Sequence, residues 1–360
     1  MEKSLFIFNF KRIPWAFLSS VFLFSIIQAA LVHTNTFWRF CYFYSTPSGC
    51  DSIRLEAQLR TIPPYDPHIK IFLIGSSQTR EDFNVEFLNE YFKEMNMVFY
   101  NLGISGYGSP MEMFALKDKF LSKSPDVMIY VTFVGSFYPD DQISLSNTLK
   151  YYFTPEVVPY VVKHIGIASL MTKDVRAIMI DYFLGEISVL FKYRDQLRQI
   201  FFTPVISYLG TEKWTKPMKY AYSKNQHPTY FAAEIIRNKG DRYKISPYTA
   251  LNEELFSLFT RDVVTKKVKL IVISGPTHPL IKETYKAEMD GLFNHFLLQQ
   301  ASETGFLYLA QKQLPSFDQR EFIDFTHLNA LGRGKFSLFI RNFLMYLNQK
   351  NDIKFYPKGN

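Results

Sequence analysis

The sequence predicts an α/β fold in which helices cover both faces of a parallel sheet. Short apolar runs recur along the chain, and stretches with helical spacing separate most of them. A continuous apolar run of this length is typical of a buried strand, and strands that alternate with helices favour parallel pairing. We therefore expect five strands, at residues 71–74, 97–100, 127–134, 268–273 and 306–309.

The segments between these strands carry the apolar spacing of helices. Helices are expected over residues 86–95, 110–121, 281–302 and 331–348. The alternation stops between the third and fourth strands, where residues 135–265 hold helical patches, aromatic clusters and loops with proline. We interpret this stretch as a long, mostly helical insertion into a domain that spans residues 69–350.

Composition excludes several classes of protein. Hydrophobic residues make up 47% of the 360 residues and charged residues 21%, which fits neither a disordered chain nor a polytopic membrane protein. The aromatic content of 17% fits a large core, although a pocket lining or a membrane contact would also use it. The formal net charge is +8, but the basic residues are scattered without zinc-finger spacing, so we expect no nucleic-acid partner.

No cofactor or metal is expected. The histidines show no spacing typical of metal ligands. The glycine pair Gly103 and Gly106 lacks the lysine of a phosphate-binding loop, so it does not indicate a nucleotide site.

The N-terminal region has the pattern of a membrane anchor. Lys3, Lys11 and Arg12 precede residues 13–32, which hold no charged residue and have about the length of a bilayer-spanning helix. The following flank is poorer in positive charge, so residues 1–12 are expected in the cytoplasm and the rest of the chain outside. A cleaved signal peptide is the alternative, although its cleavage site would be a weak match. A buried core helix is less favoured because no polar face interrupts the stretch.

Residues 33–68 are interpreted as a stalk between the anchor and the domain. They end in a proline-rich segment, Pro63 to Pro67, that cannot continue a helix. Cys41 and Cys50 are the only cysteines, and in an oxidising compartment they can close a small loop as a disulfide; two thiols are the alternative. A zinc site is not favoured, because no histidines cluster nearby. Residues 351–360 are expected to form a tail.

A candidate nucleophile follows the first predicted strand. Gly75, Ser76 and Ser77 come directly after the apolar run, and ligands of an open α/β sheet bind beyond the carboxyl ends of its strands. Glycine permits a sharp turn there, and the start of the next helix offers backbone N–H groups to a developing oxyanion. A simple turn with a helix-capping serine is the alternative explanation of this motif.

A candidate base and its carboxylate lie near the C-terminus. Asp324 and His327 are three residues apart, just before the last predicted helix, and on a helical turn this spacing puts both side chains on one side. A serine hydroxyl becomes a good nucleophile when an imidazole accepts its proton and a carboxylate fixes that imidazole. Ser77, His327 and Asp324 fill these three roles, whereas a surface capping pair would explain only the last two.

Together these residues resemble sequence blocks of the SGNH (GDSL-type) hydrolase superfamily. Residues 71–77 are similar to its first block, with Ser76 in place of the usual aspartate, as in the branch of alginate O-acetylation proteins and the teichoic-acid alanylation protein. Residues 101–106 are similar to the second block, and residues 324–332 to the fifth. The three matches occur in the order of the family and at the ends of predicted strands.

The resemblance implies a flavodoxin-like three-layer α/β/α sandwich with a serine nucleophile. Ser77 would attack an ester, His327 would act as base and then as acid, and Asp324 would orient His327. Gly106 matches the second-block glycine whose N–H stabilises the oxyanion. Asn101, in the same block, is a possible substrate-binding residue.

The family's third block is missing from this sequence. After the third strand the family has an asparagine that donates to the oxyanion, whereas residues 132–137 contain none. Either Ser136 or Thr132 substitutes for it, or the oxyanion hole relies on backbone N–H groups. Losing one such donor costs roughly 2.7–4 kcal/mol of transition-state stabilisation. His278, after the fourth strand, is a further possible substrate-binding residue at the rim of the site; a structural hydrogen bond is the alternative.

The leading hypothesis is a membrane-anchored serine esterase or O-acyltransferase of the cell envelope. Its domain would lie outside a bacterial-type inner membrane, in the periplasm, and its substrate would be an acylated carbohydrate or lipid. Two alternatives remain. One is a binding or scaffold protein that keeps the fold with little turnover, which the missing asparagine favours. The other is a phospholipase-like lipid esterase, which the aromatic insertion and basic charge favour.

Overall fold

The computed structural model describes residues 13–44, 51–64, 66–104, 106, 108–138, 145–149, 152–200, 245–284, 287–324 and 326–350. Its centre is a sheet of five strands, all parallel, in the order β2-β1-β3-β4-β5. The strands are β1 Ile69–Gly75, β2 Met97–Asn101, β3 Val127–Thr132, β4 Lys269–Ser274 and β5 Leu307–Leu309. The predicted α/β class and the parallel sheet are confirmed.

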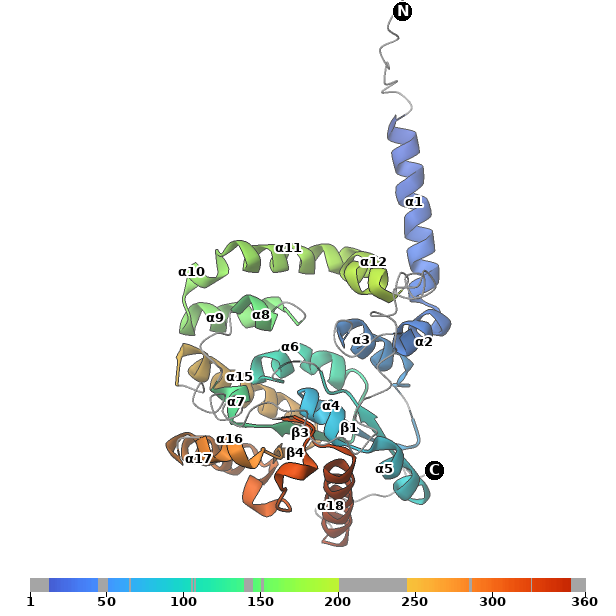
Figure 1. Ribbon diagram of the computed structural model, residues 1–360. Helices are drawn as coiled ribbons and strands as arrows, with labels where there is room; N and C mark the ends of the chain where they lie inside the picture. The colour runs from blue at the N-terminus through green and yellow to red at the C-terminus, as the bar shows by residue number, and fades with distance from the viewer. Residues whose placement is uncertain are drawn as a thin grey trace, which may run out of the picture.

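Helices connect these strands and cover the sheet (Figure 1). The bounds of those nearest the sheet are α3 Asp51–Thr61, α4 Ser77–Asp82, α5 Val85–Phe92, α6 Pro110–Leu121, α15 Pro247–Thr265, α16 Pro279–Thr284, α17 Ala287–Thr304 and α18 Ala330–Gln349. The predicted helix over 86–95 is α5 followed by a 3₁₀ turn, which ends at Asn96 with a positive φ of 58°.

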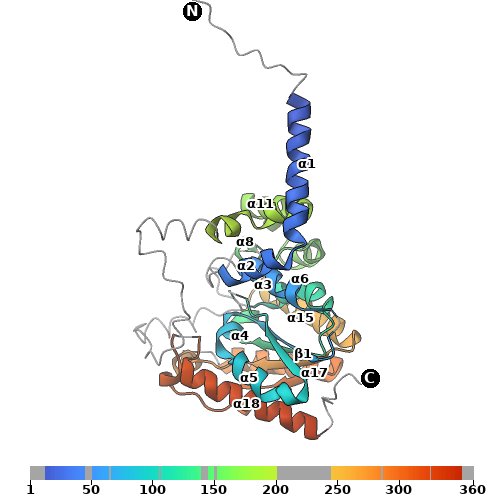
Figure 2. The same ribbon diagram turned by 90° about the vertical axis from the view of Figure 1, so that its right-hand side faces the viewer.

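Alternate side chains of the strands point to opposite faces of the sheet, as the pleat requires. Phe72 and Tyr130 belong to the cluster that packs against α6, α15 and α17. Ile71 and Ile129 belong to the cluster that packs against α5 and α18. Both faces are therefore covered by helices, an arrangement consistent with three layers (Figures 1 and 2).

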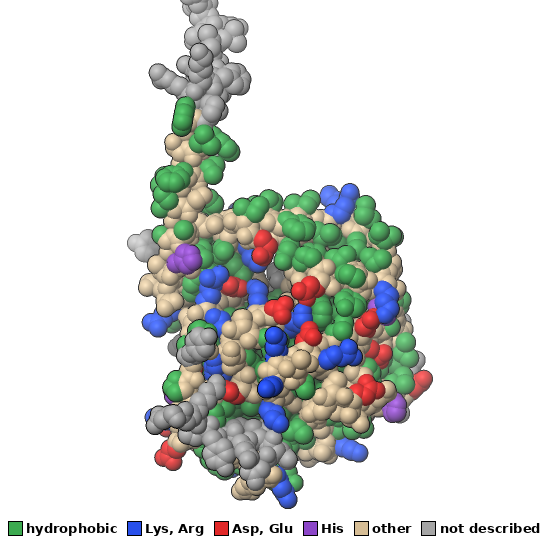
Figure 3. Space-filling model, turned by 180° about the vertical axis from the view of Figure 1, so that it is seen from behind, with side chains coloured by type: hydrophobic (Ala, Val, Ile, Leu, Met, Phe, Trp, Pro, Cys, Tyr) green, Lys and Arg blue, Asp and Glu red, His purple; other side chains and the backbone are tan. Residues whose placement is uncertain are grey.

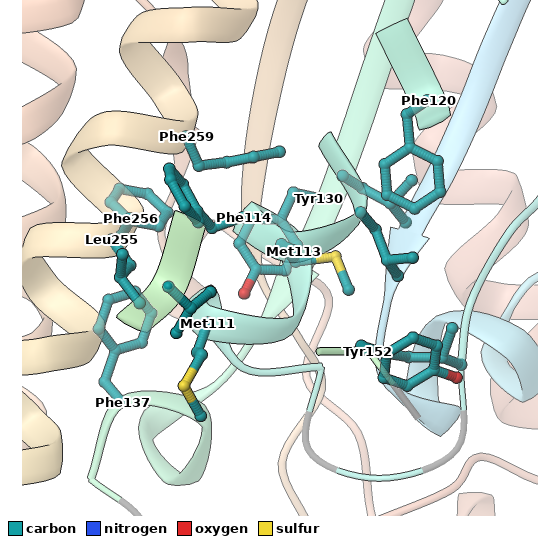
Figure 4. Close-up of a cluster of buried hydrophobic side chains, with 14 of the residues drawn as sticks. Met111, Met113, Phe114, Phe120, Tyr130, Phe137, Tyr152, Leu255, Phe256 and Phe259 are labelled. Atoms are coloured by element: carbon teal, nitrogen blue, oxygen red, sulfur yellow. The ribbon is translucent and has the colours of Figure 1, made fainter. Parts of the chain in front are cut away.

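Aromatic side chains fill the larger of these clusters (Figure 4). The ring of Tyr130 on β3 lies 6.1 Å from that of Phe256 and 5.9 Å from that of Phe259, both on α15. Phe256 also meets Phe137 edge to face, with ring centroids 5.2 Å apart. Offset and edge-on aromatic pairs of this kind stabilise a core beyond their buried area. Much of the chain's aromatic content is thus core.

Helices also occupy the stretch between β3 and β4. They are α7 Val134–Phe137, α8 Leu145–Leu149, α9 Val158–His164, α10 Ile167–Leu170, α11 Lys173–Ile187, α12 Val189–Lys192 and then α15. The insertion predicted at 135–265 therefore includes α15, whose apolar side packs against the sheet. In Figure 1, α8 and α9 lie between α6 and α11, so α11 forms an outer layer of the body. Residues 201–244 lie outside the described ranges.

The N-terminal apolar stretch forms helix α1, Ile13–Val32, with the predicted bounds. In both ribbon views α1 projects away from the body (Figures 1 and 2). Among the helices of the described ranges, no single one has the length and hydropathy of a membrane span, whereas Phe17–Ala30 and Asn35–Phe43, bent by 77°, meet that criterion as a pair.

The segment predicted as a stalk is helical and packed. It contains α2 Asn35–Tyr44 and α3, and Trp38 and Cys41 on α2 are buried against Ile53 and Tyr193. The physical reason is the helical spacing of Phe37, Trp38 and Cys41, which gives α2 one apolar side. Cys50 and the predicted terminal segments 1–12 and 351–360 lie outside the described residues, so the disulfide stays a prediction.

Candidate active site

Ser77 is held at the carboxyl end of β1 by a tight turn into α4. Gly75 has φ +136°, and a Cβ there would lie 2.3 Å from the carbonyl oxygen of Val131 on the neighbouring strand. Only glycine fits this position. Ser76 caps the helix, because its Oγ accepts a hydrogen bond of 3.1 Å from the backbone N–H of Gln78. Ser77 is therefore the first helical residue, and its side chain is half-buried.

His327 and Asp324 lie on a short loop before α18. The loop is closed by the bridge between Phe322 and Leu328 and by a hydrogen bond from the Ile323 N–H to the His327 carbonyl. Asp324 Oδ1 accepts from the backbone N–H groups of Thr326, at 2.7 Å, and His327, at 2.8 Å. The expected helical turn is thus wrong in detail. The side chains of Asp324 and His327 lie on the same side of the loop because the Asp324 carboxylate accepts hydrogen bonds from the backbone N–H groups of the residues that follow it, which holds the loop in a tight turn.

The three predicted catalytic side chains form one hydrogen-bonded chain. Ser77 Oγ lies 2.8 Å from His327 Nε2. His327 Nδ1 lies 2.7 Å from Asp324 Oδ2. Ser77 and His327 are 250 positions apart in the sequence, so the fold alone brings them together. A nucleophile, a base and a group that orients the base are within the reach that acyl transfer requires.

Burial and the Asp324–His327 interaction shift the pKa values of these two residues in opposite directions. Burial disfavours both ionised groups, but the hydrogen bond between them and their opposite charges outweigh it. The pKa of Asp324 is lowered below its ordinary 3.8, and the pKa of His327 is raised above 6.5. Asp324 therefore stays ionised at neutral pH, and its charge favours the protonated form of His327.

Two buried polar residues of α4 tie the serine to the histidine loop. Gln78 Nε2 donates to the carbonyl of Pro276 at 2.9 Å and to that of Thr326 at 3.0 Å. Asp82 Oδ1 accepts from the Leu328 N–H at 2.8 Å. Burial, together with the nearby charges of Asp324 and Glu81, raises the pKa of Asp82 to about 8, against the lowering effects of His327 and Leu328.

Sequence reasoning missed Gln78 and Asp82. Helix α4 reads Ser-Gln-Thr-Arg-Glu-Asp, a polar run that resembles an exposed turn, yet Gln78, Thr79, Glu81 and Asp82 are buried. The available signal is position: a polar run directly after a buried strand and a candidate nucleophile lies at the carboxyl edge of the sheet.

The loop after β2 packs against the turn that holds Ser77. Asn101 Nδ2 donates to the carbonyls of Thr79 and Arg80 at 3.0 Å each, and its Oδ1 accepts from the Gly103 N–H at 3.1 Å. The Asn101 side chain thus fixes the end of α4, a structural role beside the predicted substrate-binding one.

Glycines bring that loop close to the serine. Gly106 is exposed and has φ +110°. Gly108 has φ +55°, and a Cβ on it would lie 2.2 Å from the backbone nitrogen of Ser76. Tyr130 donates from its hydroxyl to the Gly108 carbonyl at 2.7 Å, which anchors the loop to β3.

Glu112 closes the far end of the same loop. Its Oε2 accepts from the backbone N–H of Ser109 at 2.8 Å, and the Ser109 hydroxyl lies 3.1 Å away. This is a capping box at the start of α6. Burial raises the pKa of Glu112 to about 7, although its hydrogen bonds from Ser109 and Gly108 oppose the rise.

The two remaining predicted site residues are buried at the neighbouring strand ends. Ser136 lies in α7, after β3, and its carbonyl accepts from Asn252 Nδ2 at 3.2 Å. His278 precedes α16, where its Nδ1 accepts from the Leu280 N–H at 3.2 Å and its ring meets that of Phe322 at 5.0 Å. These contacts are of the kind expected from the alternative prediction for His278, a structural hydrogen bond.

Other groups of interest lie elsewhere. Within the described part of the chain, no three His, Cys, Asp or Glu side chains form a group that could hold a metal ion. A cavity of about 1020 Å³ lies between α3, α6 and the helices α11 and α12, and its lining includes Ser52, Lys119, Tyr182 and Arg194.

No protein-family model matches the chain, and no curated protein is significantly similar to it.

Proposed function

We propose that the chain is a serine esterase or O-acyltransferase of the SGNH type. The observation that carries the proposal is the hydrogen-bonded chain from Ser77 through His327 to Asp324, at the carboxyl edge of a parallel sheet. The strand order β2-β1-β3-β4-β5 supports it, because flavodoxin-like doubly wound sheets share that order and bind ligands at this edge.

The proposed reaction has two steps. Ser77 Oγ attacks the carbonyl carbon of an ester, and His327 Nε2 takes the hydroxyl proton. The tetrahedral intermediate collapses to an acyl-serine as His327 returns the proton to the leaving alcohol. Water or an acceptor hydroxyl then attacks the acyl group, loses its proton to His327, and releases an acid or a new ester with Ser77 restored.

The oxyanion is assigned to backbone donors. Ser77 stands at the first position of α4, where its N–H has no partner within the helix, and Gly106 matches the family glycine with an N–H in this role. The positive φ of Gly106 supports this assignment, because a turned peptide can direct its N–H away from the loop. The family's third donor, an asparagine, has no counterpart in residues 132–137.

The proposed location of the chain is supported by α1 and by the resemblance. We propose that α1 anchors the chain in a bacterial-type inner membrane with the domain on the periplasmic side. The exposed apolar side chains of α1, such as Trp15, Phe22 and Ile26, support a lipid environment for this helix. The proposed substrate is an acylated carbohydrate or lipid of the envelope.

A probe experiment tests the catalytic proposal. The full-length protein in detergent is incubated with p-nitrophenyl acetate and, separately, with a serine-directed fluorophosphonate. Nitrophenol release and a covalent label on Ser77 are expected, and Ser77→Ala should lose both. Ser122→Ala removes an exposed serine hydroxyl on the far end of α6 and should keep both. A folded protein without label on Ser77 contradicts the proposal.

The missing asparagine favours a second candidate, a binding or scaffold protein with the same fold. In that case Ser77→Ala would leave the cellular phenotype intact, whereas the enzyme proposal predicts its loss. A lipid esterase is distinguished by another assay, because it alone would release fatty acid from anionic vesicles.

A further inference from the structure

Helix α11 is apolar on both of its faces. Val175, Ile178 and Tyr182 face the core cluster beneath it. On the opposite face Ile180, Phe183 and Ile187 are 59%, 55% and 77% exposed. Spacings of three and four residues align these three side chains in one stripe. A helix that covers a globular core normally turns a polar face to solvent, so this outer stripe indicates a partner.

The stripe continues onto α10. Ile167 and Met171, at the N-terminal end of α11, are 66% and 61% exposed. Figure 3 shows hydrophobic side chains gathered along the top of the body, the side occupied by α10 and α11 in Figure 1. We call this surface the outer face of α10–α11, defined by Ile167, Met171, Ile180, Phe183, Leu184 and Ile187.

The position of α1 indicates what covers this face. Helix α1 leaves the body beside the C-terminal end of α11, where Gln28 contacts the Ile187 carbonyl and the Ser188 hydroxyl. From there it projects on the same side as the outer face, and α11 runs crosswise to it (Figures 1 and 2). A bilayer entered by α1 down to the level of Gln28 would therefore lie against α11.

The charges around the face fit a lipid surface. Two of the acidic residues on α11 are paired, since Asp181 contacts Arg194 at 2.7 Å and Glu186 contacts Lys192 at 2.8 Å. Asp174, on the first turn, is exposed beside Lys173. Lys173 and Arg176 are exposed on the first turns of α11, on the side of the helix that continues the stripe. Apolar residues flanked by cations are typical of helices that lie in the interface of anionic membranes.

We propose that the outer face of α10–α11 lies in the headgroup region of the bilayer that α1 enters. The domain would then contact the membrane at two places, one helix across it and one along it, which fixes the orientation of the domain. The inference rests on the proposed anchoring by α1 and is independent of the proposed catalysis.

Nitroxide depth measurements test the proposal. The full-length chain carries Cys41→Ala and Cys50→Ser, and a single spin label is attached at Ile180→Cys, Phe183→Cys or Ile187→Cys. Phe22→Cys on α1 serves as the bilayer control, and Leu338→Cys serves as the aqueous control, since Leu338 is exposed on α18 across the sheet. The protein is reconstituted into vesicles of phosphatidylethanolamine and phosphatidylglycerol, and accessibility to oxygen and to a nickel chelate is compared.

We expect the three α11 labels to lie about 5–10 Å below the lipid phosphates, with Phe22 deeper and Leu338 in water. Aqueous labels at all three α11 positions, with Phe22 immersed, would overturn the inference and leave the anchoring intact. An aqueous Phe22 label would overturn both. Spin–spin broadening between copies at α11, without preferential oxygen access, would assign the face to a second copy of the chain instead. Fluorophosphonate labelling of Ser77 reports on catalysis separately from all of these outcomes.

Discussion

Replacing Asp82 with asparagine should stabilise the protein, and increasingly so as the pH rises. Asp82 is fully buried under the histidine loop, where one oxygen accepts from the Leu328 N–H at 2.8 Å. The other oxygen has no hydrogen-bond partner among the described residues. Burial raises the pKa of this carboxyl to about 8. Asparagine keeps the acceptor for Leu328 and carries no charge at any pH.

The direction in which the free energy of unfolding changes with pH follows from proton linkage. The folded protein holds the Asp82 proton up to about pH 8, while the unfolded chain releases it near the ordinary pKa of 3.8. The stability that this group contributes is therefore complete below pH 3.8 and falls as the pH rises to about 8. Between pH 5 and 8 the loss is at most about 4 kcal/mol, at about 1.4 kcal/mol for each pH unit.

Urea unfolding of the full-length protein in detergent, at pH 5 and pH 8, measures this effect. The gain in unfolding free energy of Asp82→Asn over the native chain should grow by up to about 4 kcal/mol between the two pH values. Glu94→Gln, which removes an exposed carboxyl, should give the same small change at both. A gain for Asp82→Asn that does not depend on pH would refute the reasoning, because Asp82 would then be ionised in the folded state.

Three further predictions concern the site itself. Asp324→Asn should lower kcat for p-nitrophenyl acetate roughly 10⁴-fold with little change in KM, since His327 loses the carboxylate that orients it. Because the base must be unprotonated and the pKa of His327 is raised, kcat/KM should increase with pH through a midpoint above 6.5; a midpoint below 6.5 contradicts this. Gly108→Ala should cost more than about 1 kcal/mol in urea unfolding, since its Cβ would lie 2.2 Å from the Ser76 nitrogen at a positive φ. Its control, Gly334→Ala, has open space around the new methyl group and should not destabilise.

The sheet could be predicted from sequence because its central strands are apolar runs that helices bury on both faces. Residues 71–74 and 127–131 are such runs, and all of them are buried. The pairing of Ser77 with His327 could also be predicted, since each follows a strand or precedes a helix at the same edge of the sheet. The hydrogen bond between Ser77 and His327 could not be predicted, because these residues are 250 positions apart and the bond depends on how the chain between them folds.

The packed N-terminal helices and the outer layer escaped prediction for a different reason. The apolar side of α2 is short and meets Tyr193 and Leu197, which lie far along the chain, so no local pattern reveals the contact. Helix α11 is apolar on two faces, and its sequence alone does not say which one meets the core. Only the contacts of Val175 and Tyr182 distinguish the inner face from the outer.

Helix α4 shows why local sequence rules fail at this site in particular. Gln78 and Asp82 are polar side chains in the interior, and an acid with a pKa of about 8 works against folding at neutral pH. In return, Gln78 joins the turn that holds Ser77 to the loop that holds His327. A helix selected for stability alone would carry apolar residues in these positions. Conflict between burial and polarity is expected where a chain must hold reacting groups in place, and α4 is where the proposed nucleophile stands.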